Sequence, residues 1–128
     1  EKAIEKYHIK TSGNQEGETP VKFMSGGNQQ KVILAREITE HSKLIIANQP
    51  TRGLDIGATQ FVRQVWMDQR NEGKSVILIS ADLEEIMQLS DRVAVMFGGK
   101  IVGVQKKEEI EMEQLGLLMG GITKEEMK

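Results

Sequence analysis

The sequence predicts an α/β fold, in which a short parallel sheet is flanked by helices and followed by a C-terminal β-hairpin. Two continuous apolar runs, residues 44–47 and 75–80, lie on either side of a helical segment at about 58–71. Continuous apolar runs are typical of strands covered on both faces in a parallel sheet. The order strand, helix, strand therefore predicts a right-handed crossover unit. Gly98-Gly99 between two further apolar runs predicts the hairpin.

The N-terminal region is predicted to be a short charged helical stretch followed by a loop. Residues 11–20 are polar and include two glycines and a proline, which favours a loop. A helix is then predicted from Asn28 to about Glu40, with Ser25 as its N-cap. Its apolar stripe consists of Val32, Ala35 and Ile38.

The crossover helix is predicted from about Ala58 to Asn71, and Gly73 is predicted to stop it. Its apolar positions share one helical face: Phe61, Val62, Val65 and Trp66. Because Trp66 shares that face, we assign it to the core rather than to a base-stacking platform. After the second strand, Asp82 and Glu85 resemble a capping box that opens another helix.

The C-terminal region is predicted to contain two strands, at residues 92–97 and 100–104, joined by the glycine pair. The tail from Lys106 is acidic and is predicted to be helical. Its apolar positions are Ile110, Leu115, Leu118 and Met119.

Composition excludes several classes of function. A net charge of -2 without a long basic run argues against a nucleic-acid partner. The absence of cysteine excludes disulfides and thiolate metal sites, and His8 and His41 lack the neighbours of a metal site. No apolar run approaches the roughly 20 residues of a membrane-spanning helix, so any link to a membrane is expected to come through a partner.

The most informative stretch is Ser-Gly-Gly-Asn-Gln-Gln-Lys, which starts at Ser25. Two glycines at the start of a helix leave backbone N–H groups accessible at the positive end of the helix dipole, where phosphate binds well. The Ser25 hydroxyl adds a further donor. A plain serine cap with a glycine entry explains the same residues, so the physics alone leaves both interpretations open.

This stretch resembles the signature motif of ABC ATPases, in the variant typical of fused sugar and nucleoside importers. Residues 48–51 stand where the Walker B sequence of that family ends, residues 53–55 resemble its D-loop, and residues 80–82 occupy its switch position. Residues 115–121 resemble the end of such importer subunits. The resemblance covers residues 1 to 121, nearly the whole chain.

The resemblance implies that each ATP lies between the P-loop of one domain and the signature of another. On this analogy four residues contact the γ-phosphate of a nucleotide seated on a partner domain that has a P-loop: Ser25, Gly26, Gly27 and Gln29. Asp55, in the D-loop, is expected at the domain interface. Transmembrane permease subunits are the other expected partners, and the expected location is peripheral, at the cytoplasmic face of a bacterial membrane.

No Gly-x-x-x-x-Gly-Lys-Ser/Thr sequence occurs in the chain, so we expect it to be inactive as an ATPase by itself. ATP and Mg²⁺ are expected in the complete protein and neither in the isolated chain. We therefore expect a fragment, the C-terminal part of a P-loop NTPase-like domain. Residues 1–42 would end the helical subdomain with the signature helix, 43–105 would run from Walker B to the last strands, and 106–128 would form the C-terminal helix.

Three departures from the family concern the hydrolytic positions. Asn48 stands where an Asp supports Mg²⁺ and is a weaker ligand for a hard cation. Gln49 stands where the general base Glu is expected and cannot take a proton, a loss that typically costs roughly 10²–10⁴-fold in rate. Ala81 replaces the switch His. The resemblance thus implies a degenerate second domain whose signature serves a partner.

Two alternatives come from other classes. One is a non-catalytic dimerisation module with the ABC fold, which would not need the glycine pair. The other is a non-transport ABC ATPase of DNA repair or translation, in which an acidic residue usually follows the glycine pair, unlike Asn28 and Gln29 here. Cut from its P-loop half, the sheet would expose an unpaired edge and an apolar face, so we expect the isolated chain to self-associate.

Overall fold

The computed structural model describes residues 5–7, 9, 20, 22, 24–38 and 41–122. The predicted loop at residues 11–20 therefore lies, apart from Pro20, outside the described residues. The chain divides into two compact units, Glu1–Ser80 and Ala81–Lys128. Each unit has its own two-stranded sheet.

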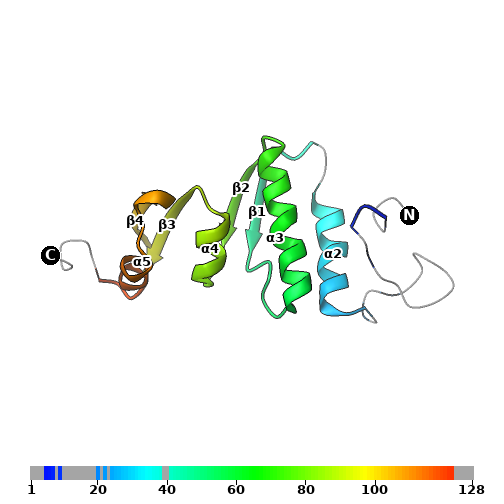
Figure 1. Cartoon of the computed structure of the whole chain (residues 1–128), viewed down its shortest axis with the longest axis horizontal. Helices are drawn as coiled ribbons and strands as arrows, with labels where there is room; N and C mark the ends of the chain where they lie inside the picture. The colour runs from blue at the N-terminus through cyan, green and yellow to red at the C-terminus, as the bar shows by residue number, and fades with distance from the viewer. Residues whose placement is uncertain are drawn as a thin grey trace. The chain divides into compact units, whose positions relative to one another are not determined.

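The first unit contains α2 (Gly26–Glu37), β1 (Leu44–Asn48), α3 (Ile56–Asn71) and β2 (Ser75–Ile79). The two strands pair in parallel, with Ile46 opposite Ile77. α3 connects them, packs on β2 and has α2 beside it (Figure 1). The predicted crossover unit and α/β class are thus confirmed.

Local signals account for the limits of α3. Asp55 is its N-cap, so the helix begins at Ile56, two residues before the predicted start. At the other end Gly73 adopts a φ of 87°, a left-handed conformation that suits glycine, and the chain turns into β2. The predicted helical face is confirmed, because Val62, Val65 and Trp66 are buried.

The two faces of the parallel sheet differ in exposure. Ile45 and Ala47 point to the buried face. On the opposite face four aliphatic side chains are about half exposed or more: Leu44 54%, Ile46 64%, Ile77 49% and Ile79 48%. The continuous apolar runs are typical of strands covered on both faces, and among the described residues only one face is covered. The exposed second face confirms the expectation that the sheet of this chain presents an apolar face. We call these four residues the open sheet face.

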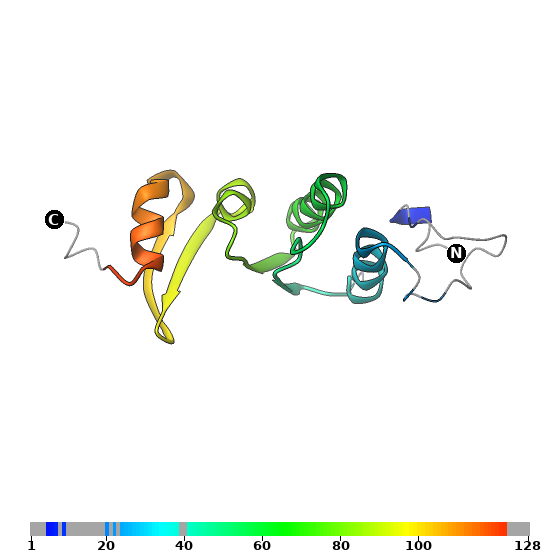
Figure 2. The same cartoon turned by 90° about the horizontal axis from the view of Figure 1, so that it is seen from below.

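The second unit contains α4 (Leu83–Leu89), β3 (Arg92–Phe97), β4 (Lys100–Lys106), the 3₁₀ turn η2 (Lys107–Glu109) and α5 (Met112–Met119). β3 and β4 pair antiparallel through a tight turn at Gly98 and Gly99, whose φ angles of 56° and 77° require glycine-like freedom. The predicted hairpin is confirmed. α5 lies along it (Figure 2).

A small core holds the second unit together. It is built from Val93 and Val95 of the hairpin and Leu115 and Leu118 of α5, with side chains of α4 packed against it. The tail differs from the prediction in its start, because β4 continues to Lys106 and a 3₁₀ turn precedes the helix. Met119, predicted as an apolar position, is 39% exposed.

Candidate functional site

The four residues that the resemblance predicts to contact phosphate lie at the start of α2. Ser25 is the N-cap, as predicted, with extended backbone angles. Its Oγ accepts hydrogen bonds from the backbone N–H of Asn28 at 3.4 Å and from Asn28 Nδ2 at 3.1 Å. Because both bonds use Oγ as the acceptor, the hydroxyl proton of this exposed side chain is left to donate to a ligand.

The neighbouring backbone supplies further donors. The first N–H groups of a helix have no carbonyl partner within it, and this applies to Gly26 and Gly27. Gln29, the fourth predicted contact, points its Nε2 back to the carbonyl oxygen of Met24 at 2.9 Å and so steadies the turn that leads into the helix. The start of α2 therefore combines a hydroxyl donor, two N–H groups and the positive end of the helix dipole.

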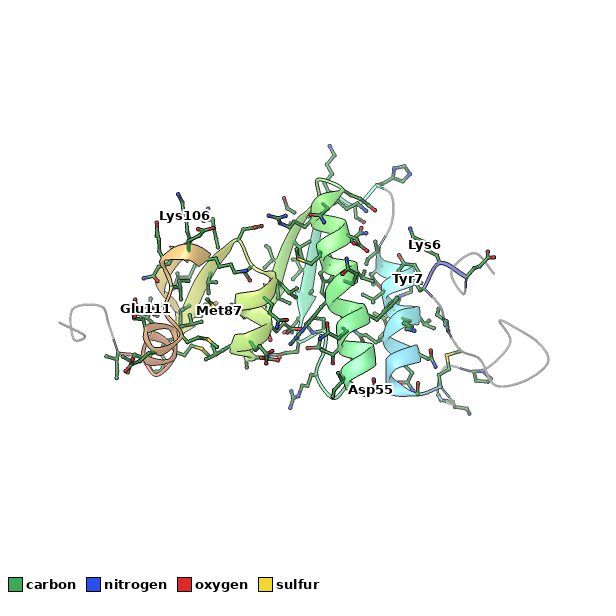
Figure 3. All side chains as sticks on the ribbon, viewed as in Figure 1. Lys6, Tyr7, Asp55, Met87, Lys106 and Glu111 are labelled. Atoms are coloured by element: carbon green, nitrogen blue, oxygen red, sulfur yellow. The ribbon has the colours of Figure 1, made fainter. Side chains whose placement is uncertain are left out.

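The predicted D-loop lies beside this helix start. Asp55 caps α3 through Oδ1, which accepts from the N–H of Ala58 at 2.8 Å. A Cβ added at Gly27 would lie 4.0 Å from Asp55 Oδ2 and only 2.8 Å from the Cβ of Ala58. Figure 3 shows Asp55 at the start of α3, next to the start of α2. The structure thus brings Gly27 and Asp55 together.

Sequence reasoning missed two features of this contact. It assigned Asp55 to a domain interface and not to the N-cap of α3, although an Asp three residues before Ala58 is a usual cap signal. It also predicted Ala58 only as the approximate first residue of a helix and did not predict its contact with another helix. Nothing local in the sequence indicates that Ala58 lies against Gly27, because the two residues belong to different helices.

The ends of the parallel strands carry the two predicted hydrolytic positions of the first unit. Asn48 is the exposed last residue of β1, and Gln49 follows it. Gln49 has a φ of 49°, the one positive φ among the described non-glycine residues. Two backbone hydrogen bonds hold it, from its N–H to the carbonyl oxygen of Ile79 at 2.8 Å and from the N–H of Arg52 to its carbonyl oxygen at 3.2 Å.

The third hydrolytic position, Ala81, belongs to the second unit and is exposed. Asp82 follows it and caps α4, since its Oδ1 accepts from the N–H groups of Glu84 at 3.0 Å and Glu85 at 3.2 Å. This confirms Asp82 as the predicted cap. Ala81 itself has only a methyl group to offer a ligand.

Metal-ligand clusters and membrane-spanning helices are both absent from the described residues. No group of three or more His, Asp or Glu side chains is arranged there to hold a metal ion. No helix in the same ranges has the length and apolar character needed to cross a membrane.

Comparison with known proteins gives relatives over most of this chain. It is 48% identical over 123 residues to the guanosine import ATP-binding protein NupO of Bacillus subtilis (strain 168), which is 96% of this chain and 24% of NupO. It is 50% identical over 98 residues, 77% of this chain, to the glucose import ATP-binding protein TsgD13 of Haloferax volcanii, and covers 18% of that protein. Ribose import ATP-binding protein RbsA of Bacillus cereus is 41% identical over 82% of this chain, which covers 21% of RbsA.

The chain therefore spans about a quarter or less of the length of these relatives. Among solved structures, it resembles the ATP-binding cassette MJ0796, determined as a dimer in a post-hydrolysis state with ADP and phosphate. The TM-score is 0.68 at 22% sequence identity, over 83% of this chain and 44% of that cassette. This similarity shows that the two chains share a fold. No protein-family model matches the chain.

Proposed function

This chain belongs to the ABC ATPase family, and on that premise we propose that the start of α2 completes the ATP site of a partner ABC domain that carries a P-loop. The residues that act are Ser25, Gly26, Gly27 and Gln29. One observation carries the proposal: the exposed Ser25 hydroxyl and the first N–H groups of α2 stand together at a single helix start.

The chemistry of these donors suits the terminal phosphate of ATP. Proteins of this family bind ATP with Mg²⁺, and a phosphate is the most negatively charged part of that ligand. Backbone N–H groups at a helix start bind phosphate without a charged side chain, because the helix dipole adds to their partial charges. The glycines let the phosphate approach the backbone closely.

The chain does not fit a nucleotide of its own. The sequence has no Gly-x-x-x-x-Gly-Lys-Ser/Thr segment to hold β- and γ-phosphates. The residues at the hydrolytic positions also lack the expected groups. Asn48 lacks the negative charge of an Asp, Gln49 lacks the basic carboxylate of a Glu, and Ala81 lacks the imidazole ring of a His. We therefore propose no hydrolytic step by these three residues, and the role of the chain is to serve the nucleotide of its partner. Asp55 supports that role by fixing the D-loop against Gly27.

The wider setting follows from the relatives. Since they are named for the import of guanosine, glucose and ribose, we place this chain in an importer for a simple sugar or nucleoside. Its further partners would then be transmembrane permease subunits, and its location would be peripheral, at the cytoplasmic face of the membrane. A nucleotide held between two such domains would join them, and its hydrolysis would release them.

Two substitutions at one position test the proposal. Asp and Asn are N-caps as good as Ser, so Ser25→Asp and Ser25→Asn both keep α2 capped. Only the Asp variant places a negative charge against the incoming phosphate. The assay is ATP hydrolysis by an ABC import domain with an intact P-loop, alone and with the 128-residue chain added.

We expect the unchanged chain to stimulate hydrolysis, the Asn variant to retain most of that stimulation, and the Asp variant to lose it by about 100-fold, the scale of removing one main transition-state contact. Circular dichroism of the two variants should coincide. Equal stimulation by the Asp and Asn variants, or no stimulation by the unchanged chain, would contradict the proposal.

A further inference from the structure

The close contact between the first turns of α2 and α3 points to a residue that the proposed function does not include. A Cβ placed on Gly27 would lie 2.8 Å from the Cβ of Ala58, a distance at which one of the two helices must move. The same added atom would meet nothing else closer than Asp55 Oδ2 at 4.0 Å. Among the described residues, Ala58 is thus the α3 residue that a side chain at Gly27 would strike.

The contact continues along both helices with larger side chains. One turn further on, the Nζ of Lys31 lies 4.5 Å from the centre of the Phe61 ring, a favourable cation–π distance. Aliphatic side chains are buried further along: Leu34 in α2 and Ile38 at its C-cap, and Val62 and Val65 in α3. The separation of packed helices depends on the side chains between them, so the smallest pair permits the closest approach. That pair is at the start of α2.

We propose that Ala58 is a positioning residue for the phosphate-binding start of α2, an inference that rests on the proposed function. Ala58 does not touch the phosphate. Its side chain is small enough to let the backbone of Gly27 approach α3, and this close approach sets where the N–H groups of Gly26 and Gly27 lie. Asp55, three residues earlier, holds the same first turn of α3 through its bond to the N–H of Ala58 at 2.8 Å.

The consequence is a fixed distance between the D-loop and the phosphate donors. Rates fall by about 100-fold when groups that bind a reacting centre are displaced by roughly 1 Å. Two further methyl groups on residue 58 would push the start of α2 away by a distance of that order, because the gap at Gly27 is already filled. The rest of α2 would remain anchored by buried Leu34 and by buried Ile38 at its C-cap.

Three variants separate positioning from plain stability. Ala58→Val adds bulk at the contact, and Gln60→Val places the same β-branched side chain at an exposed position of the same helix. Ala58→Gly removes the methyl group and keeps the space, although Gly is a poorer helix former than Val. The assay is the stimulation of ATP hydrolysis described above, measured over a range of ATP concentrations together with the thermal midpoint of each chain.

We expect Ala58→Val to reduce the stimulation at least 10-fold, and Gln60→Val and Ala58→Gly to change it less than 3-fold. The Gly variant would then stimulate more than the Val variant, although Gly is the poorer helix former. If Ala58 acted only by stabilising α3, the order of the two variants would be reversed. In NMR spectra of the chain alone, Ala58→Val should shift the Gly26 and Gly27 amide resonances, and Gln60→Val should not. If the unchanged chain stimulates and Ala58→Val does so equally, or its amide shifts are unchanged, this inference is overturned while the proposed function stands.

Discussion

The backbone N–H of Gln49 donates a 2.8 Å hydrogen bond to the carbonyl oxygen of Ile79, the last residue of β2. This bond continues the parallel pairing one residue past the end of β1 and ties the start of the segment that follows β1 to the sheet. It also holds Gln49 in a left-handed conformation, with a φ of 49°. A residue with a Cβ is strained in this conformation, and such strain persists only where neighbouring structure enforces it.

Substitutions at Gln49 should report this strain. Gln49→Gly is expected to raise the free energy of unfolding by up to about 1 kcal/mol, because relief of the left-handed strain exceeds the entropy cost of glycine. Gln49→Val is expected to lower it by about 1–2 kcal/mol, since β-branched residues are rare at positive φ. Urea unfolding followed by circular dichroism measures both. Identical midpoints for Gly and Val would show that the backbone at this position is not strained.

Adding a methyl group at Gly27 should destabilise the chain although it improves helix propensity. Gly27→Ala places a Cβ 2.8 Å from that of Ala58, and overpacking of this kind costs about 1–3 kcal/mol. Gly116→Ala in α5 is the matched control, because an added Cβ there meets nothing within 4 Å. That control should gain about 0.5–1 kcal/mol from helix propensity. Thermal unfolding of both variants decides the matter, and a stabilised Gly27→Ala chain would contradict the described contact.

A second close approach, between Gly121 and Phe97, can be tested with a double-mutant cycle. Gly121 has a φ of 85°, and an added Cβ would lie 2.6 Å from two atoms of the Phe97 ring. Gly121→Ala should cost about 2–3 kcal/mol in the unchanged chain, from overpacking and the positive φ together. In a Phe97→Ala background only the conformational part, about 1 kcal/mol, should remain. Equal costs in the two backgrounds would mean that the ring does not restrict this position.

The local signals in the sequence predicted most elements correctly. Ser25 caps α2, Gly73 ends α3, and the glycine pair at 98 and 99 turns the hairpin, because each depends on a residue's own backbone preferences. For the candidate site, the sequence predicted which residues belong to it but not which of them are in contact. Its geometry was not predicted, because the contact of Gly27 with Ala58 arises from packing between helices. The left-handed Gln49 was missed for the same reason, since the partner that holds it is Ile79 on another strand.

The open sheet face shows a different limit of sequence reasoning. A continuous apolar run indicates that both faces of a strand are apolar, and it cannot tell what covers each of them. In β1 the buried positions Ile45 and Ala47 alternate with Leu44 and Ile46, which remain largely exposed. The apolar run alone predicted the strand, and the exposed second face was expected only from the resemblance, which implies a fragment.

This face should drive self-association of the isolated chain. Ile46 and Ile77 are cross-strand neighbours, 64% and 49% exposed, so they form the centre of an apolar patch. Ile46→Lys is expected to shift the chain toward monomer in sedimentation velocity at increasing concentration. Ile56→Lys is the control, since Ile56 is 84% exposed and is the first residue of α3 rather than part of a strand. Equal effects of the two substitutions, or a monomeric unchanged chain, would argue against association through the open sheet face.

The measurement that tests the central claim most directly is sedimentation of this chain mixed with a P-loop-bearing ABC import domain, with and without Mg-ATP. The catalytic Glu of that partner should be replaced by Gln so that the nucleotide persists. The account predicts a one-to-one complex that forms with Mg-ATP, is absent without it, and fails to form with Ser25→Asp. A complex that forms equally well without nucleotide would instead favour a non-catalytic interaction module, and no complex under either condition would contradict the claim that this chain completes a partner's ATP site.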